Sequence, residues 1–150
     1  LSIDPEVCNR ASMFRSLQEN SCIVSAINLK KIQAFTGVEI EEIVFAGGAS
    51  KGALWSQILA DVTGCKVKIP KVTEATALGA AMAAGVGAGV YDSLVDASER
   101  LVTWDKAYVP NAENFENYQK IAEQWEEVYV EQLKLVDRRL VESMWVAPGL

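Results

Sequence analysis

Two glycines separate a short apolar run from a helical stretch, and the turn they form is suited to holding an anion. Gly47 and Gly48 follow the apolar residues 43–46, and Ser50 and Lys51 come soon after them. Glycines here let the backbone approach a ligand with no Cβ in the way, and the start of the next helix offers unpaired N–H groups. Such turns bind ligands at the carboxyl ends of strands in open α/β sheets. The alternative is a plain strand-to-helix turn, which is commoner for a lone Gly-Gly pair.

Other side chains near this turn offer little further chemistry. The turn is not a P-loop, because no Gly-Lys-Ser/Thr sequence closes it and Lys51 precedes Gly52. The chain contains no histidine to activate Ser50, so we expect the Ser50 hydroxyl to cap the next helix. Lys51 is expected to be an exposed lysine at the start of that helix, from which it can also reach a phosphate. No pair of carboxylates stands out as a catalytic dyad.

Hydrophobic periodicity places the turn within a βαβ unit. Residues 43–46 predict a strand buried on both faces, and residues 50–62 predict a helix that ends at Gly64. Residues 67–69 predict a second strand, which should lie parallel to the first. Before this unit, Asp4-Pro5-Glu6 is a helix-start signal, and helical spacing continues to about Phe35, with Gly37 as the stop.

Three more elements follow the second strand. Thr73 is expected to cap a helix over about 74–84, whose many small residues would allow close approach to a sheet or another helix. Residues 101–104 predict a short strand. After Pro110 a long amphipathic helix is expected, with apolar positions three or four residues apart. These positions are Trp125, Tyr129, Leu133, Val136 and Leu140.

Composition predicts one soluble domain over residues 1–150. Fourteen basic and 20 acidic residues give a net charge of -6 with no basic cluster, which disfavours nucleic-acid binding. No apolar run approaches the ~18 residues needed to span a bilayer, so no membrane partner is expected. Cys8, Cys22 and Cys65 are odd in number and far apart, and we expect them to be reduced, mostly buried thiols of a cytoplasmic protein.

Four motifs in order make these separate signals specific. They are Arg10-Ala11 with Leu17-Gln18-Glu19, then 45–51, then 54–64, then Pro70 with 74–81. Together they strongly resemble the C-terminal domain of the FGGY carbohydrate kinases, the family of glycerol kinase and xylulokinase, over roughly residues 10 to 138. The remainder, including Trp104 and residues 145–150, is most similar to the branch that phosphorylates autoinducer-2, the linear dihydroxy-pentanedione of quorum sensing.

The resemblance implies an α/β, actin/Hsp70/hexokinase-like (ribonuclease H-like) fold, of which this chain is a partial C-terminal domain with a long C-terminal helix. In this family two domains close on a cleft, with the sugar held mainly by the N-terminal domain and ATP, with Mg²⁺, mainly by the C-terminal one. By position, Gly47, Gly48 and Ala49 would lie against the ribose and phosphates of ATP. Ser50 and Lys51 would open the helix beside them.

The chain departs from the family pattern in two places. Many relatives carry a polar residue, often Asn, where this chain has Gly52, so a side-chain contact to the nucleotide is lost or moved. The family's catalytic Asp and phosphate loops lie before the matched region, so we expect a fragment of a longer two-domain kinase that does not turn over alone.

Three functions stay open from the sequence. The first is an autoinducer-2 kinase, the second is a kinase of an ordinary pentulose or polyol, and the third is a non-catalytic nucleotide-binding domain. We also expect the isolated chain to self-associate, because its sheet should have an uncovered edge. The long C-terminal helix could supply part of that contact.

Overall fold

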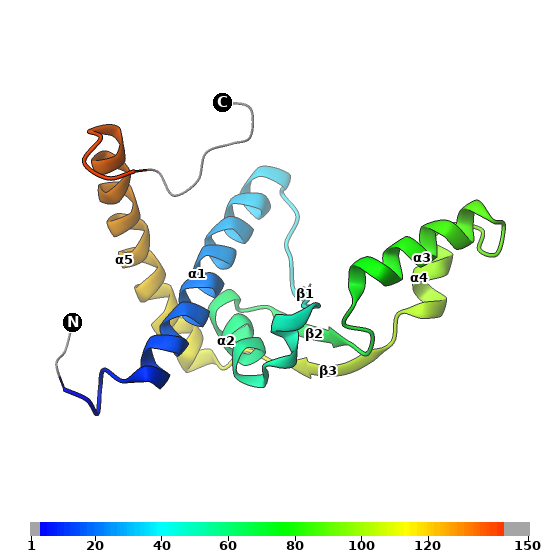
Figure 1. Ribbon diagram of the computed structural model, residues 1–150, viewed down its shortest axis with the longest axis horizontal. Coiled ribbons are helices and arrows are strands. Elements are labelled where there is room, and N and C mark those ends of the chain that lie inside the picture. Colours follow the sequence, from blue (N-terminus) through cyan, green and yellow to red (C-terminus); the bar gives the residue numbers. More distant parts are fainter. Residues whose placement is uncertain (1–3, 143–150) are drawn as a thin grey trace.

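The computed structural model describes residues 4–142 as a mixed α/β protein, and the predicted irregular tail 143–150 lies outside them. A three-stranded sheet lies between a group of packed helices and a projecting helix pair (Figure 1). In chain order the elements are α1 (Arg10–Thr36), β1 (Glu42–Val44), the 3₁₀ turn η1 (Gly48–Lys51), α2 (Ala53–Thr63), β2 (Lys66–Pro70), α3 (Ala75–Gly87), α4 (Leu94–Leu101), β3 (Trp104–Tyr108) and α5 (Ala112–Asp137).

The strands run in the order β1-β2-β3, with β1 and β2 parallel and β2 and β3 antiparallel. Ile43 lies opposite Val67, and Val67 lies opposite Tyr108. The helix α2 connects the two parallel strands, so the predicted βαβ unit is confirmed. The register turns Val67 and Ile69 toward the helices, where both are buried.

The core lies between α1, α2, α5 and the helix-covered face of β2. It is formed mainly by aliphatic residues at helical spacing, as a packed helix pair on a sheet requires. Its buried members are Cys22, Ile23, Ala26 and Ile27 of α1, Ile58, Leu59, Ala60 and Val62 of α2, Val67 and Ile69 of β2, and Tyr118 and Ala122 of α5.

The first helix begins later than its sequence signal suggested. Asp4 closes only a turn, in which its carboxylate accepts a hydrogen bond from the Glu6 amide at 2.9 Å. The true N-cap is Asn9, whose side chain accepts from the amides of Ala11 and Ser12, while the Ser12 hydroxyl accepts from the Asn9 amide. This reciprocal capping box satisfies several N–H groups and outweighs the turn at Asp4. The predicted stop at Gly37 is confirmed, in a left-handed conformation.

The prediction that the first strand is buried on both faces is wrong. The strand spans Glu42–Val44, and the Val44 side chain is 59% exposed. Helices cover the face that bears Ile43, whereas the face that bears Val44 is open in the part of the chain that the structure describes. The strand is also at the edge of the sheet, so the predicted uncovered edge is present among these residues.

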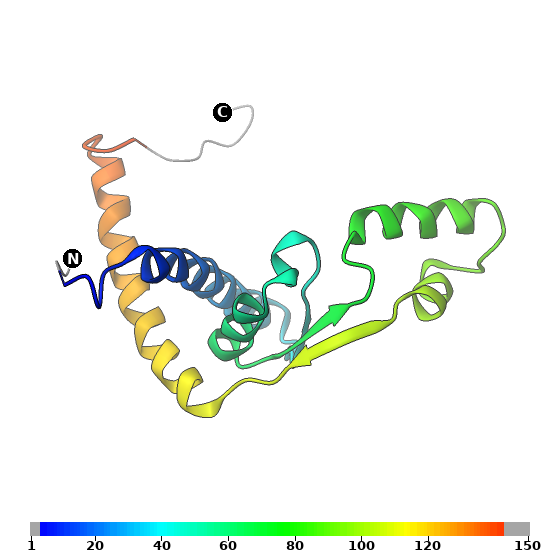
Figure 2. The ribbon, with the colours of Figure 1, turned by 60° about the horizontal axis from the view of Figure 1, so that its bottom comes forward.

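The helix pair α3–α4 departs from prediction in both its caps and its packing. The N-cap of α3 is Glu74, and Thr73 contributes only its carbonyl oxygen, which accepts from the Ala75 amide. The small-residue helix does not pack closely on the sheet but projects from it with α4 (Figure 2). Met82 is the one residue of α3 that is buried.

Residues 94–101 form the unpredicted helix α4, which moves the third strand to Trp104–Tyr108 instead of 101–104. The Ser93 hydroxyl caps α4 by accepting from the Asp96 amide at 3.1 Å. A serine followed three residues later by an acid is a start signal that sequence reasoning could have used.

The long C-terminal helix is confirmed, with Asn111 as its N-cap and Asp137 as its last residue, so Leu140 lies beyond it. Among the described residues no helix is both long enough and apolar enough to cross a membrane.

All three cysteines are free thiols, as predicted, and two of them are buried. Burial raises the pKa of the Cys22 thiol to about 11, and it also raises the pKa of Cys65. Because the thiolate is the reactive form, we expect Cys8 to react first with a thiol reagent at pH 8, with Cys22 and Cys65 following only on unfolding. Mass mapping of labelled peptides tests this order. Rapid labelling of Cys22 in the folded chain would contradict it.

Candidate functional site

The Gly47–Lys51 turn leaves the carboxyl end of β1, as predicted, and is held by hydrogen bonds on both sides. The Gly47 amide donates to the carbonyl of Thr73 at 2.9 Å, which ties the turn to the segment before α3. The Gly47 carbonyl accepts from the Ser50 hydroxyl at 2.7 Å and from the Ser50 amide at 3.3 Å. The five predicted residues therefore form one compact turn. Thr73 was missed as its anchor, because a backbone acceptor has no residue-type signal.

Ser50 has a different role from the predicted helix cap. Its side chain is buried, and its hydroxyl is engaged by the Gly47 carbonyl within the turn. Residues 48–51 form the 3₁₀ turn η1, and α2 starts only at Ala53 with Gly52 as its N-cap. A 3₁₀ turn brings residue i+3 close to residue i, so the Ser50 hydroxyl reaches back instead of forward.

The backbone requires glycine at only the first of the two glycine positions in the turn. Gly47 has φ 86°, a conformation that other residues adopt only with strain. Gly48 has no positive φ, and a Cβ built on it would meet no atom within 4 Å. The fold itself does not require glycine at position 48. The space beside this exposed glycine is consistent with close approach by a ligand.

Beyond the turn, the first turn of α2 presents backbone donors without a capping side chain. The N-cap residue Gly52 has no side chain that could accept a hydrogen bond from these N–H groups, so they have no capping partner. Lys51 is exposed beside this helix start, as predicted. Free N–H groups, the positive end of the helix dipole and a lysine together favour an anion such as a phosphate.

An apolar hollow of about 210 Å³ adjoins the carboxyl ends of β1 and β2. It lies between those strand ends and the α3–α4 pair. Its lining is Val44, Ala46, Pro70, Val72, Ala75, Leu78, Gly79, Met82, Ser98 and Val102. On the other side of β1, Trp55 packs edge-on against Phe45 at 6.5 Å and donates to the Ser21 hydroxyl at 3.2 Å, so this indole belongs to the core packing.

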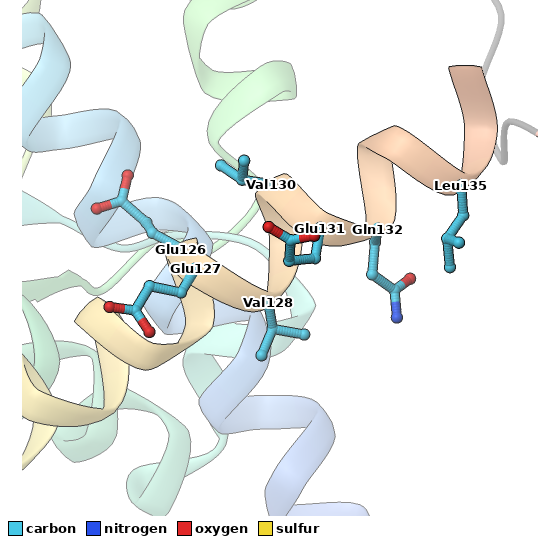
Figure 3. A pocket seen from close by; sticks show the side chains of 7 residues that line it. All are labelled: Glu126, Glu127, Val128, Val130, Glu131, Gln132 and Leu135. Atoms are coloured by element: carbon cyan, nitrogen blue, oxygen red, sulfur yellow. The ribbon is translucent and has the colours of Figure 1, made fainter. Parts of the chain in front are cut away.

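A larger hollow, of about 840 Å³, lies along α5 (Figure 3), and none of its described lining comes from the glycine turn. Its described lining includes the carboxylates of Glu126, Glu127 and Glu131, which would repel a phosphate. It is therefore not a candidate nucleotide site. Within residues 4–142 there is also no group of three His, Cys, Asp or Glu side chains placed to hold a metal ion.

Comparison with known proteins shows which family and which relatives this chain is similar to. The family model described as the FGGY family of carbohydrate kinases, C-terminal domain, matches residues 4–88. The autoinducer-2 kinase of Salmonella paratyphi B is 60% identical over all 150 residues, which correspond to 28% of its length. The chain thus spans well under half of that relative.

Solved structures show the same fold at low sequence identity. A xyloylose kinase from Brucella ovis matches with a TM-score of 0.76 and 18% identity over 90% of this chain and 27% of its own. A Plasmodium falciparum glycerol kinase with ADP matches with a TM-score of 0.68 and 22% identity over 95% of this chain and 26% of its own. The predicted actin/hexokinase-like fold is confirmed by these likenesses. From the family model and the relatives together, this chain belongs to the FGGY family of carbohydrate kinases, in the part that forms their C-terminal domain.

Proposed function

We propose that this chain is the ATP-binding part of a kinase that transfers the γ-phosphate of ATP to a hydroxyl of autoinducer-2, linear dihydroxy-pentanedione. The observation that carries the proposal is the 60% identity to an autoinducer-2 kinase over every residue of the chain. Identity of this extent is far above the 18% to 22% shared with the solved sugar kinases named above. We infer the same substrate for the longer protein of which residues 1–150 would be one domain.

In this proposal the glycine turn binds the nucleotide. Gly48 leaves room for the ribose and phosphates, and the amides of Gly48 and Ala49 with those of the first turn of α2 face them. Lys51 adds a positive charge, and Ser50 keeps the turn closed through its bond to Gly47. The ADP named with the Plasmodium falciparum glycerol kinase supports a nucleotide as the ligand of this fold.

Mg²⁺ would accompany ATP, because kinases usually hold it through substrate phosphates and one or two carboxylates. The described residues offer no three-ligand cluster of their own, so we assign none of them to the ion. Binding and orientation are the contributions of this chain. We propose that the base that accepts the substrate proton, and the pocket for the sugar, belong to an N-terminal domain outside residues 1–150. Use of ATP and free thiols are consistent with the cytoplasm.

We expect the isolated 150-residue chain to show no phosphorylation of autoinducer-2 above a no-enzyme control, because this proposal assigns the base and the sugar pocket to a domain outside residues 1–150. The assay is transfer of labelled phosphate from ATP, with the longer kinase as the positive control. Turnover by the chain that an internal substitution abolishes would contradict this division of roles.

Substrate profiling of the longer kinase tests the choice of substrate. We expect kcat/KM for autoinducer-2 to exceed that for xylulose, glycerol and related polyols by at least about 100-fold, because even a small difference in fit to the pocket gives discrimination of that order. A preference for xylulose would favour the second candidate, a pentulose kinase, which the likeness to the xyloylose kinase supports at the level of fold. No phosphorylation of any polyol, with ATP still bound, would favour a non-catalytic nucleotide-binding domain.

A further inference from the structure

The distal segment of α5 with its C-cap Arg138, residues 127–138, has no neighbouring element over much of its surface among the residues that the structure describes. The proximal part of the helix is anchored, since Tyr118 and Ala122 are buried and the Trp125 indole donates to the Asn20 side chain at 2.8 Å. The Glu126 carboxylate still pairs with Lys31 at 3.9 Å. Past this point the helix extends away from α1 (Figures 1 and 2). The distal segment is therefore available to a partner.

One face of the distal segment carries two apolar side chains and a glutamine. Val128, Gln132 and Leu135 fall within an arc of about 60° on an α-helix, next to the stripe of Tyr118, Ala122 and Trp125 that anchors the proximal part. The Val128 side chain is 59% exposed and Leu135 is 36% exposed. Together with the neighbouring carboxylates they line the hollow of about 840 Å³ shown in Figure 3, whose described lining comes from α5 alone. An amphipathic helix face of this kind normally packs against another element.

The charges beside this face identify the partner. Glu127, Glu131, Lys134 and Arg138 share a second arc of about 60° immediately next to the apolar one. Both acids come first and both bases come last along the chain. Glu127 and Arg138 are equidistant from the midpoint of the segment, and so are Glu131 and Lys134. In two antiparallel copies of the segment, the same flanks face each other, so each acid would lie beside a base of the other copy.

We propose that residues 127–138 form an interface between two copies of this chain, which pack with their distal α5 segments antiparallel. A twofold axis near Gln132 would place Val128 of one copy near Leu135 of the other. Glu127 would pair with Arg138, and Glu131 with Lys134, twice each. Glu131 and Lys134 already form an exposed ion pair within the helix. Such an exposed pair is weak and can exchange partners at little cost.

The test uses two charge variants of the whole 150-residue chain and sedimentation velocity over a concentration series. Glu127→Lys with Glu131→Lys makes the flank wholly basic, and Lys134→Glu with Arg138→Glu makes it wholly acidic. We expect the native chain to dimerise and each variant alone to have a dissociation constant raised roughly tenfold or more, because like charges then face each other. An equimolar mixture of the two variants should dimerise again, since all four cross-copy pairs become attractive.

The matched control is Glu116→Lys with Glu123→Lys, which makes the same charge change as the basic variant at two exposed positions in the proximal part of α5, outside residues 127–138. This control should dimerise like the native chain. A native chain that stays monomeric at all concentrations would overturn the proposal. An equimolar mixture of the two charge variants that stays monomeric would also overturn it. That result would mean that the exposed face of α5 binds another segment of a longer polypeptide. Equal weakening by the control would reduce the effect to net charge and overturn the proposal as well.

Discussion

Gly48→Val in the longer kinase is expected to lower the apparent affinity for ATP by roughly 100-fold while leaving the fold intact, a loss of the size that a small misplacement of a bound group produces. A Cβ at this position meets no protein atom within 4 Å, so we expect the added side chain to enter the space proposed for the nucleotide. We expect the free energy of unfolding to change by less than about 0.5 kcal/mol, as for other exposed substitutions. Isothermal titration with ATP and urea unfolding measure the two quantities.

Gly47→Ala is the matched comparison, because the neighbouring glycine has φ 86°. Alanine there should cost about 1 to 3 kcal/mol of stability through backbone strain alone. The two substitutions therefore have different expected effects: Gly48→Val lowers the affinity for ATP, and Gly47→Ala lowers the free energy of unfolding. Unchanged ATP affinity in the Gly48 variant would place the nucleotide elsewhere, and a collapse of its stability would mean that Gly48 serves only the turn.

Asp61→Ala is expected to destabilise the chain by about 3 to 5 kcal/mol, because three donors would lose a buried acceptor at about 1 to 3 kcal/mol each. Asp61 is buried on α2, where it is 3% exposed. Its carboxylate accepts from the Gln57 side chain at 2.8 Å, from the Asn111 amide at 2.9 Å and from the Asn114 side chain at 2.8 Å. The carboxylate also lies at the positive end of α5, where a negative charge is favourable.

The alanine variant would leave three donors without their acceptor and loosen the start of α5. The midpoint of urea unfolding measures the loss, with little change expected in the slope. Asp105→Ala, at an exposed position on β3, is the control and should shift stability by less than about 0.5 kcal/mol. Equal effects of the two substitutions would show that the Asp61 cluster does not hold α5 to α2.

Asp61 also illustrates what sequence reasoning could not supply. Its partners Asn111 and Asn114 are 50 and 53 residues away in the chain. Helical spacing placed Asp61 on α2 but indicated nothing about what it would contact. The same holds for the Thr73 carbonyl that anchors Gly47, because backbone groups have no signature by residue type.

The wrong predictions of burial also arose because the sequence does not show which distant groups meet. The apolar residues 43–46 predicted a strand covered on both faces, yet Val44 is 59% exposed in the described part of the chain. An apolar side chain shows that a residue is suited to burial, but it does not show which element covers it. The small residues of α3 led to the same error, because they permit close packing but do not show which element packs against them.

The sequence by itself determined the local features: the helix stops at Gly37 and Gly64, the βαβ unit, the glycine turn, the long last helix and the family. Each depends on residues a few positions apart, through backbone conformation, capping or periodicity, and such short-range signals can be read from the chain alone. The tertiary structure decided that Ser50 closes the turn, that Gly48 is free of any steric need for glycine, and that Asp61 joins α2 to α5. These outcomes depend on which distant groups meet and on how much space is left between them, and that is set only when the whole chain packs.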